Sequence, residues 1–240
     1  MALSPTSQWT LVACGVMAHA DGVLDGEECD RLLAMVEDEA DGEEYSEWLA
    51  ALGDAKRLEQ LLEELPPAPA EDHREILENA WTLAIVDGER TDPEAATLER
   101  IAARLGVESV QLEFWREAWT EAQTSFARNV TEALEVILGG EAAVAEDDRK
   151  LLTEFVWRLP TSNEHREQLA GTVAEACDKD AVARELNALP RRRRQWLLRL
   201  LAPTARASTS PDDAGRRFVE LAEAAGLARD RAEALLAGGD

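Results

Sequence analysis

The chain has 240 residues, and its 49 acidic and 25 basic side chains give a formal net charge of −24. Hydrophobic residues make up 45% of the chain and charged residues 31%, which is typical of a folded globular protein and excludes a disordered polyanion. The negative charge disfavours nucleic acids and anionic membranes as partners. No stretch approaches the roughly 18 uncharged apolar residues of a membrane span, and the N-terminus lacks the basic and apolar regions of a signal peptide.

The negative charge is concentrated in one half of the chain. Residues 1–125 carry 29 acidic and 8 basic side chains, a net charge of −21, whereas residues 126–240 carry 20 and 17, a net charge of −3. The length suits two domains of about 120 residues, and we expect any cation site in the first. The cysteines Cys14, Cys29 and Cys177 form no CxxC motif and no zinc spacing, which indicates a cytoplasmic protein with reduced thiols.

Helix start and stop signals recur along the whole chain. Serine or aspartate before proline predicts a helix start, because these residues cap N-termini and proline suits the first helical position; the pairs are Ser4-Pro5, Asp92-Pro93 and Ser210-Pro211. The proline-rich segment 65–70 separates two helix pairs. Glycines just past predicted helix ends are Gly22, Gly88, Gly106 and Gly226.

Apolar residues recur at three- and four-residue spacing, and no window shows the alternation of a strand. Two such faces are Leu98, Ile101, Ala102 and Leu105, and Leu151, Leu152, Phe155, Val156 and Leu159. We therefore predict an all-α chain of roughly twelve to fourteen short helices. We expect Trp81 and Leu98 in the core of the first half, and Trp157 and Phe218 in that of the second. Trp115 and Trp119 belong either to the core or to a stripe that faces a partner.

The sequence repeats itself at two levels. In the first half, Val16–Glu28 and Leu83–Glu94 each contain an apolar helix, an Asp-Gly and a glutamate seven residues after the aspartate. At an offset of about 118–120 residues, the second half repeats the helical pattern. Its matching segments are Gly140–Leu152, Ala205–Asp212 and Glu220–Gly226. We interpret residues 126–240 as a second copy of 1–125 that has lost the Asp-Gly pairs.

These motifs, with Ile101–Gly106, resemble the TerB-like tellurite-resistance domain over about residues 5–123, and residues 126–240 resemble it as a degenerate copy. The resemblance implies two tandem helical bundles, with acidic motifs in the first that bind a divalent metal. It also implies a non-catalytic role in a bacterial chemical-stress or phage-defence system, with other proteins of that system as partners.

The residues themselves also favour a metal. The predicted helices place Asp21 and Asp87 in last turns, where the helix dipole disfavours a negative charge by roughly 0.3–1 kcal/mol. Helix-end carbonyls offer further oxygen ligands, and Ca²⁺ and Mg²⁺ prefer such oxygen clusters. We predict a Ca²⁺ or Mg²⁺ site made by Asp21, Glu28, Asp87 and Glu94, with Asp25 and Asp92 as second-rank ligands.

Structural explanations for the same residues remain open. Asp-Gly is a common turn, a glutamate in a first helical turn complements the dipole, and Asp92 fits the N-cap before Pro93. An EF-hand is excluded, because Val23 and Leu32 occupy its third and twelfth positions. The alternative function is a metal-free scaffold or adaptor that docks a basic protein through the acidic half. A metal-dependent hydrolase is a third hypothesis, without a nucleophile or phosphate loop in its favour.

The remaining charged motifs have ordinary structural explanations. We expect the four successive arginines Arg191, Arg192, Arg193 and Arg194 to pair with the acidic half, with binding of a phosphate or a protein partner as the alternative. The segment 37–44 is expected to be a solvated acidic loop. The three histidines lack a second histidine at ligand spacing, which disfavours zinc.

Overall fold

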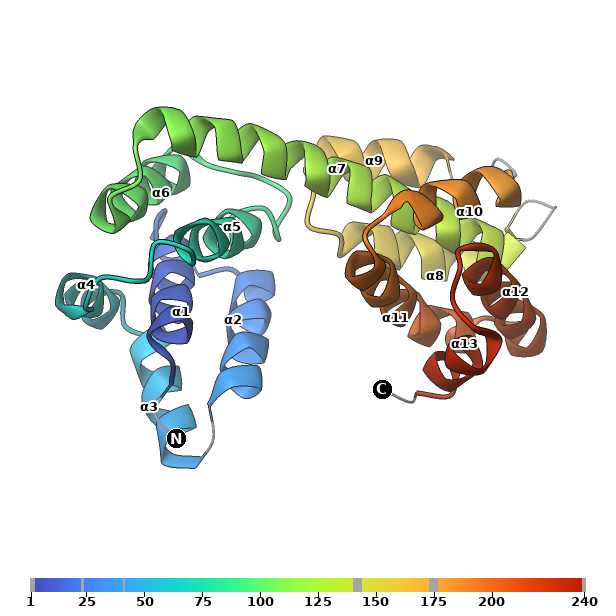
Figure 1. Cartoon of the computed structure of the whole chain (residues 1–240), viewed down its shortest axis with the longest axis horizontal. Helices are drawn as coiled ribbons and strands as arrows, with labels where there is room; N and C mark the ends of the chain where they lie inside the picture. The colour runs from blue at the N-terminus through green and yellow to red at the C-terminus, as the bar shows by residue number, and fades with distance from the viewer. Residues whose placement is uncertain (1–2, 23, 41, 140–143, 173–176, 239–240) are drawn as a thin grey trace. The chain divides into compact units, whose positions relative to one another are not determined.

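The computed structural model describes residues 3–22, 24–40, 42–139, 144–172 and 177–238. These residues form thirteen α-helices and no β-strand, so the predicted all-α fold is confirmed (Figure 1). None of the described helices is both long enough and apolar enough to cross a membrane.

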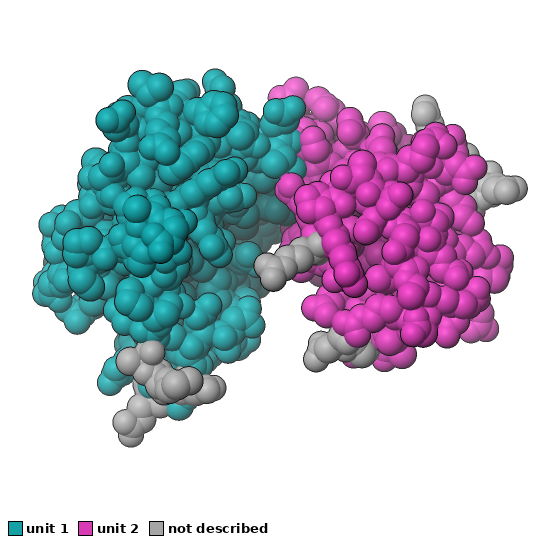
Figure 2. All heavy atoms as spheres, viewed as in Figure 1, with its two compact units in different colours: residues 1–123, 160–162 teal, residues 124–159, 163–240 magenta. Residues whose placement is uncertain are grey.

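The chain divides into two compact units (Figure 2). Unit 1 contains residues 1–123 and 160–162, and unit 2 contains residues 124–159 and 163–240. The division after residue 123 falls inside a single 31-residue helix, α7 (Ser109–Gly139). Because the boundary is helical, each unit takes part of α7 into its own core. The superposition of the two units that a duplication requires stays a prediction.

Unit 1 is built around α1, which is buried on almost every side. From Leu11 to Ala18 every residue of α1 is buried, as expected for a helix that is apolar all round. Helices α2 to α6 all contact it. The helices of this unit are α1 (Pro5–Ala18), α2 (Gly26–Glu39), α3 (Gly42–Leu52), α4 (Ala55–Glu64), α5 (His73–Leu83), α6 (Asp92–Leu105) and the first part of α7.

Unit 2 has its own hydrophobic core around the second part of α7. Ala127, Val130, Ala133 and Leu134 of that helix are fully buried. Helices α11, α12 and α13 contact one another, and α8 contacts α9 and α11. The remaining helices are α8 (Glu146–Trp157), α9 (Asn163–Thr172), α10 (Lys179–Ala188), α11 (Arg191–Ala207), α12 (Pro211–Ala224) and α13 (Arg229–Leu236).

The aromatic residues test the predicted core. Trp81, Leu98 and Phe218 are buried as predicted. The prediction for Trp157 is wrong, because its side chain is 38% exposed. Helix α8 buries Asp148, Leu152 and Val156 at four-residue spacing, and the next residue lies about 100° further round the helix, away from that face.

Trp115 and Trp119 belong to the core of unit 1. Their ring centroids are 5.9 Å apart, Trp119 is only 2% exposed, and Trp115 packs against the buried cluster. The partner-facing stripe considered from the sequence is therefore wrong for this pair.

Gly15 provides a test of packing around α1. A Cβ atom at this position would lie 2.8 Å from Cδ2 of both Leu52 and Leu58. We expect Gly15→Ala to destabilise the protein by about 1–3 kcal/mol through overpacking, despite the higher helix propensity of alanine. Gly26→Ala is the matched control, because no atom lies within 4 Å of its Cβ position. Urea unfolding measures both, and equal stabilities of the two variants would contradict the packing.

Candidate metal centre

The two Asp-Gly pairs lie in turns that follow helices. Helix α1 ends at Ala18 and α5 at Leu83, so Asp21 and Asp87 lie beyond the helix ends and not in the last turns as predicted. Tight turns continue each helix, with hydrogen bonds from Gly22 N to His19 O (3.2 Å) and from Gly88 N to Ile85 O (3.0 Å). The glycines have φ angles of 85° and 94°, which favour glycine over any residue with a side chain. Both aspartates remain exposed to solvent.

Glu28 is held by a capping box at the start of α2. The Asp25 carboxylate accepts a hydrogen bond from Glu27 N (2.8 Å), and Glu28 Oε2 accepts one from Asp25 N (3.1 Å). Glu28 is only 6% exposed. Asp25 therefore acts as the N-cap, and the capping box fixes Glu28 through one of its two carboxylate oxygens.

Glu94 has the same arrangement at the start of α6. Its Oε2 atom accepts hydrogen bonds from Thr91 N (2.6 Å) and Thr91 Oγ1 (2.8 Å), and its side chain is 6% exposed. The N-cap is Thr91, so the predicted cap at Asp92 is wrong by one residue, and Asp92 is the first residue of the helix. Proline occupies the second helical position, where it also costs no hydrogen bond.

The structure brings the four predicted first-rank carboxylates close enough to interact. Chiefly through burial, the pKa of Glu28 is raised from 4.5 to about 7, against the lowering effect of the Asp25 N–H. The charges of Glu94, Asp87 and Asp21 raise it as well. Burial likewise raises the pKa of Glu94, to which the charges of Asp87 and Asp21 contribute. Two buried glutamates and two exposed aspartates thus form one negatively charged cluster.

The chemistry of this cluster fits a hard divalent cation. Carboxylate oxygens are the ligands that Ca²⁺ and Mg²⁺ prefer. Asp21 and Asp87 face solvent, and both buried glutamates have one oxygen that is not used by the capping box. Within the described residues, however, no three Asp, Glu, His or Cys side chains are already gathered as metal ligands. A cation would have to draw the carboxylates together against their mutual repulsion.

Arg90 is a residue of this region that the sequence analysis missed. Its Nη2 atom donates to Trp81 O (3.0 Å) and to Gln123 Oε1 (2.6 Å), and its guanidinium carbon lies 3.9 Å from the centroid of the Trp81 ring. Burial lowers the pKa of Arg90 to about 10, although the nearby Glu94 acts in the opposite direction. Arg90 therefore fixes the loop between Asp87 and α6 to α5.

The four arginines begin helix α11. Arg191 and Arg193 are exposed, and the side chain of Arg192 lies outside the described part of the chain. Arg194 is half-buried and donates from Nη1 to the carbonyl oxygen (3.2 Å) and the side-chain oxygen of Asn187 within unit 2. Their contact with the acidic half stays a prediction.

Comparison with known families identifies the first unit. Residues 8–117 match the family model described as tellurite resistance protein TerB. These residues therefore form a TerB-like domain, as their motifs indicate. The match ends before unit 2, so the degenerate second copy stays a prediction. Searches of curated proteins and of solved structures each found no match.

The raised pKa of Glu28 predicts how stability depends on pH without a cation. Between pH 4.5 and 7 the unfolded chain loses this proton while the folded chain keeps it, so stability falls as pH rises. At about 1.4 kcal/mol per pKa unit, Glu28 alone contributes a loss of roughly 3 kcal/mol across this window. We expect Glu28→Gln to remove much of this slope in urea unfolding with EGTA.

The control for this experiment is Glu37→Gln, which changes an exposed glutamate on the same helix. It should keep the pH slope of the wild type. A slope that is the same in Glu28→Gln as in the wild type would contradict the raised pKa.

Proposed function

We propose that the TerB-like domain of this chain is a non-catalytic module that binds a divalent cation, Ca²⁺ or Mg²⁺, and takes part in a bacterial stress-response system of the tellurite-resistance or phage-defence kind. The cluster of Asp21, Glu28, Asp87 and Glu94 is the observation that carries this proposal. The family match supports it, since the TerB-like family is thought to bind metal through paired acidic motifs.

The cost of the cluster without a cation also supports the proposal. Burying a carboxylate is unfavourable unless its charge is compensated, and Glu28 is opposed both by burial and by three like charges. A divalent cation would neutralise this charge and replace the mutual repulsion with attraction. Because the aspartates belong to loops and the glutamates to helices α2 and α6, a shared cation would link four elements of unit 1.

A cation held in this way would add rigidity rather than chemistry. It would connect the turn after α1, the start of α2, the loop after α5 and the start of α6. In the non-catalytic module that we propose, the output is a surface whose order depends on the cation, and the partners are other proteins of the same system.

A metal-free adaptor is the second candidate, and one surface of unit 1 favours it. Val110 and Phe114 stand one helical turn apart on α7 and are 82% and 68% exposed. The exposed Glu113 and Glu117 flank Phe114. A basic protein with an apolar contact residue would complement this surface in both charge and polarity.

Thermal unfolding of the full chain distinguishes the two candidates. A ligand that binds only the folded state at a hundredfold excess over Kd stabilises it by about 2.7 kcal/mol. Millimolar Ca²⁺ should therefore raise Tm by roughly 5–10 °C. Asp21→Asn combined with Asp87→Asn should abolish this shift and can raise Tm without cation, because it removes two of the repelling charges.

The matched control combines Asp30→Asn with Asp38→Asn, which removes two exposed charges from α2. This variant should keep the full Ca²⁺ shift. If NaCl at equal ionic strength gives the wild type the same shift as Ca²⁺, general screening explains the effect and the adaptor is favoured.

A further inference from the structure

The two units bury residues in closely matching registers. Helix α2 buries Glu28, Leu32 and Val36, and α8 buries Asp148, Leu152 and Val156, each 120 positions later. Helix α5 buries Ile76, Leu77 and Ala80, and α11 buries Leu197, Leu198 and Leu201, each 121 positions later. In these registers, Asp148 stands where unit 1 has Glu28, and Ser208 stands where unit 1 has Asp87.

In unit 2 these two positions are joined by a hydrogen bond. Asp148 is only 3% exposed, and its Oδ2 atom accepts from Ser208 Oγ at 2.9 Å. Its other oxygen, Oδ1, accepts from Thr209 N at 2.8 Å, and Ser208 Oγ in turn accepts from Ser210 N at 3.1 Å. The buried carboxylate thus has a donor on each oxygen, supplied by the loop between α11 and α12.

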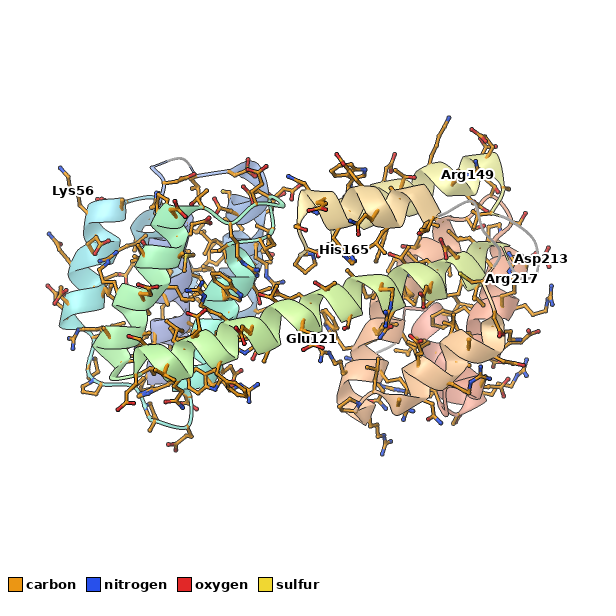
Figure 3. The ribbon with its side chains drawn as sticks, turned by 90° about the horizontal axis from the view of Figure 1, so that it is seen from above. Lys56, Glu121, Arg149, His165, Asp213 and Arg217 are labelled. Atoms are coloured by element: carbon orange, nitrogen blue, oxygen red, sulfur yellow. The ribbon has the colours of Figure 1, made fainter. Side chains whose placement is uncertain are left out.

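Unit 2 also has a positive charge of its own at the end of a helix. Arg217 of α12 donates from Nε to Ile137 O (2.6 Å) and from Nη2 to Leu138 O (2.8 Å), next to the last residue of α7 (Figure 3). A cation at a helix C-terminus satisfies free carbonyls and opposes the negative end of the dipole. At the same offset of 120, the matching place in unit 1 is the end of α1, which leads into Asp21.

The second buried glutamate of unit 1 has a neutral counterpart. Helix α6 buries Glu94, Leu98, Ile101 and Ala102, and α12 buries Ala214, Phe218, Leu221 and Ala222, each 120 positions later. Unit 2 therefore has alanine in place of Glu94. The carboxylate at Asp148 faces hydrogen-bond donors, whereas the carboxylate at Glu28 faces three other carboxylates.

We propose that unit 2 contains a cation-independent form of the junction found in unit 1, in which Ser208, Thr209 and Arg217 supply from the chain itself the donors and the positive charge that a bound cation supplies to Glu28 and Asp87. The comparison with unit 1 rests on the proposed function. The chain thereby combines one unit whose loop is ordered by a cation with one whose equivalent loop is ordered at all times.

Hydrogen–deuterium exchange of the full chain, read by mass spectrometry, resolves the two loops separately. In the wild type, 5 mM CaCl₂ instead of EGTA should slow exchange around residues 84–95 and leave exchange around 204–214 unchanged. Ser208→Ala should speed exchange around 204–214 roughly tenfold or more, the effect of losing a hydrogen bond to a charged group, with or without CaCl₂. Thr209→Ala is the matched control, because Thr209 uses its backbone N–H and its side chain is exposed.

A second pair of variants tests the arginine. Arg217→Met should speed exchange at the end of α7, and CaCl₂ should not reverse the effect. Arg216→Met removes the same charge from the neighbouring position, where the side chain pairs only with Asp213 and Glu220 on the surface of α12 among the printed ion pairs of the described residues. It should leave exchange at the end of α7 unchanged.

The outcomes separate this inference from the proposed function. If CaCl₂ fails to protect residues 84–95 but Ser208→Ala still loosens 204–214, the cation site of unit 1 is wrong and the hydrogen-bonded junction of unit 2 stands. If Ser208→Ala and Thr209→Ala exchange alike, or if CaCl₂ slows exchange around 204–214 in the wild type, the cation-independent junction is overturned, whatever happens in unit 1.

Discussion

A carboxylate that is removed from water needs donors or a counter-charge, and this requirement governs the loop junctions of both units. In unit 1, Glu28 and Glu94 are buried at the starts of α2 and α6, and each meets the requirement only in part through its capping box. In unit 2, Asp148 meets it fully, with a donor on each oxygen. The difference in electrostatics between the two units therefore lies in a few side chains and not in the helical framework.

The helical framework was predictable because its signals are local. Ser4 caps α1 as predicted, accepting from Ser7 N at 3.0 Å, and Gly106 and Gly226 have the positive φ angles of helix-terminating glycines. Errors arose where one residue decides the outcome. Trp157 neighbours the buried Val156 but faces solvent, and Thr91 caps α6 in place of Asp92. Sequence spacing does not fix the rotation of a helix against its core to better than one residue.

The candidate site was predictable in its membership but not in its detail. The repeated Asp-Gly and glutamate spacing identified four carboxylates that do interact across elements up to 73 residues apart in sequence. The capping boxes were visible as Asp25 to Glu28 and Thr91 to Glu94 but were not recognised from the sequence. Arg90 and Arg217 could not have been assigned, because their partners lie up to 33 and 80 residues away along the chain.

Isothermal titration of the full chain with CaCl₂ at pH 7, in two buffers of different ionisation enthalpy, tests the central claim most directly. Because the pKa of Glu28 is about 7 without a cation, binding must displace a proton that Glu28 holds in part of the molecules. The account predicts one Ca²⁺ per chain, a heat that differs between the buffers through proton release, and loss of both in the variant that combines Asp21→Asn with Asp87→Asn. Binding that is absent, or that persists unchanged in this variant, would contradict a cation site at the four carboxylates.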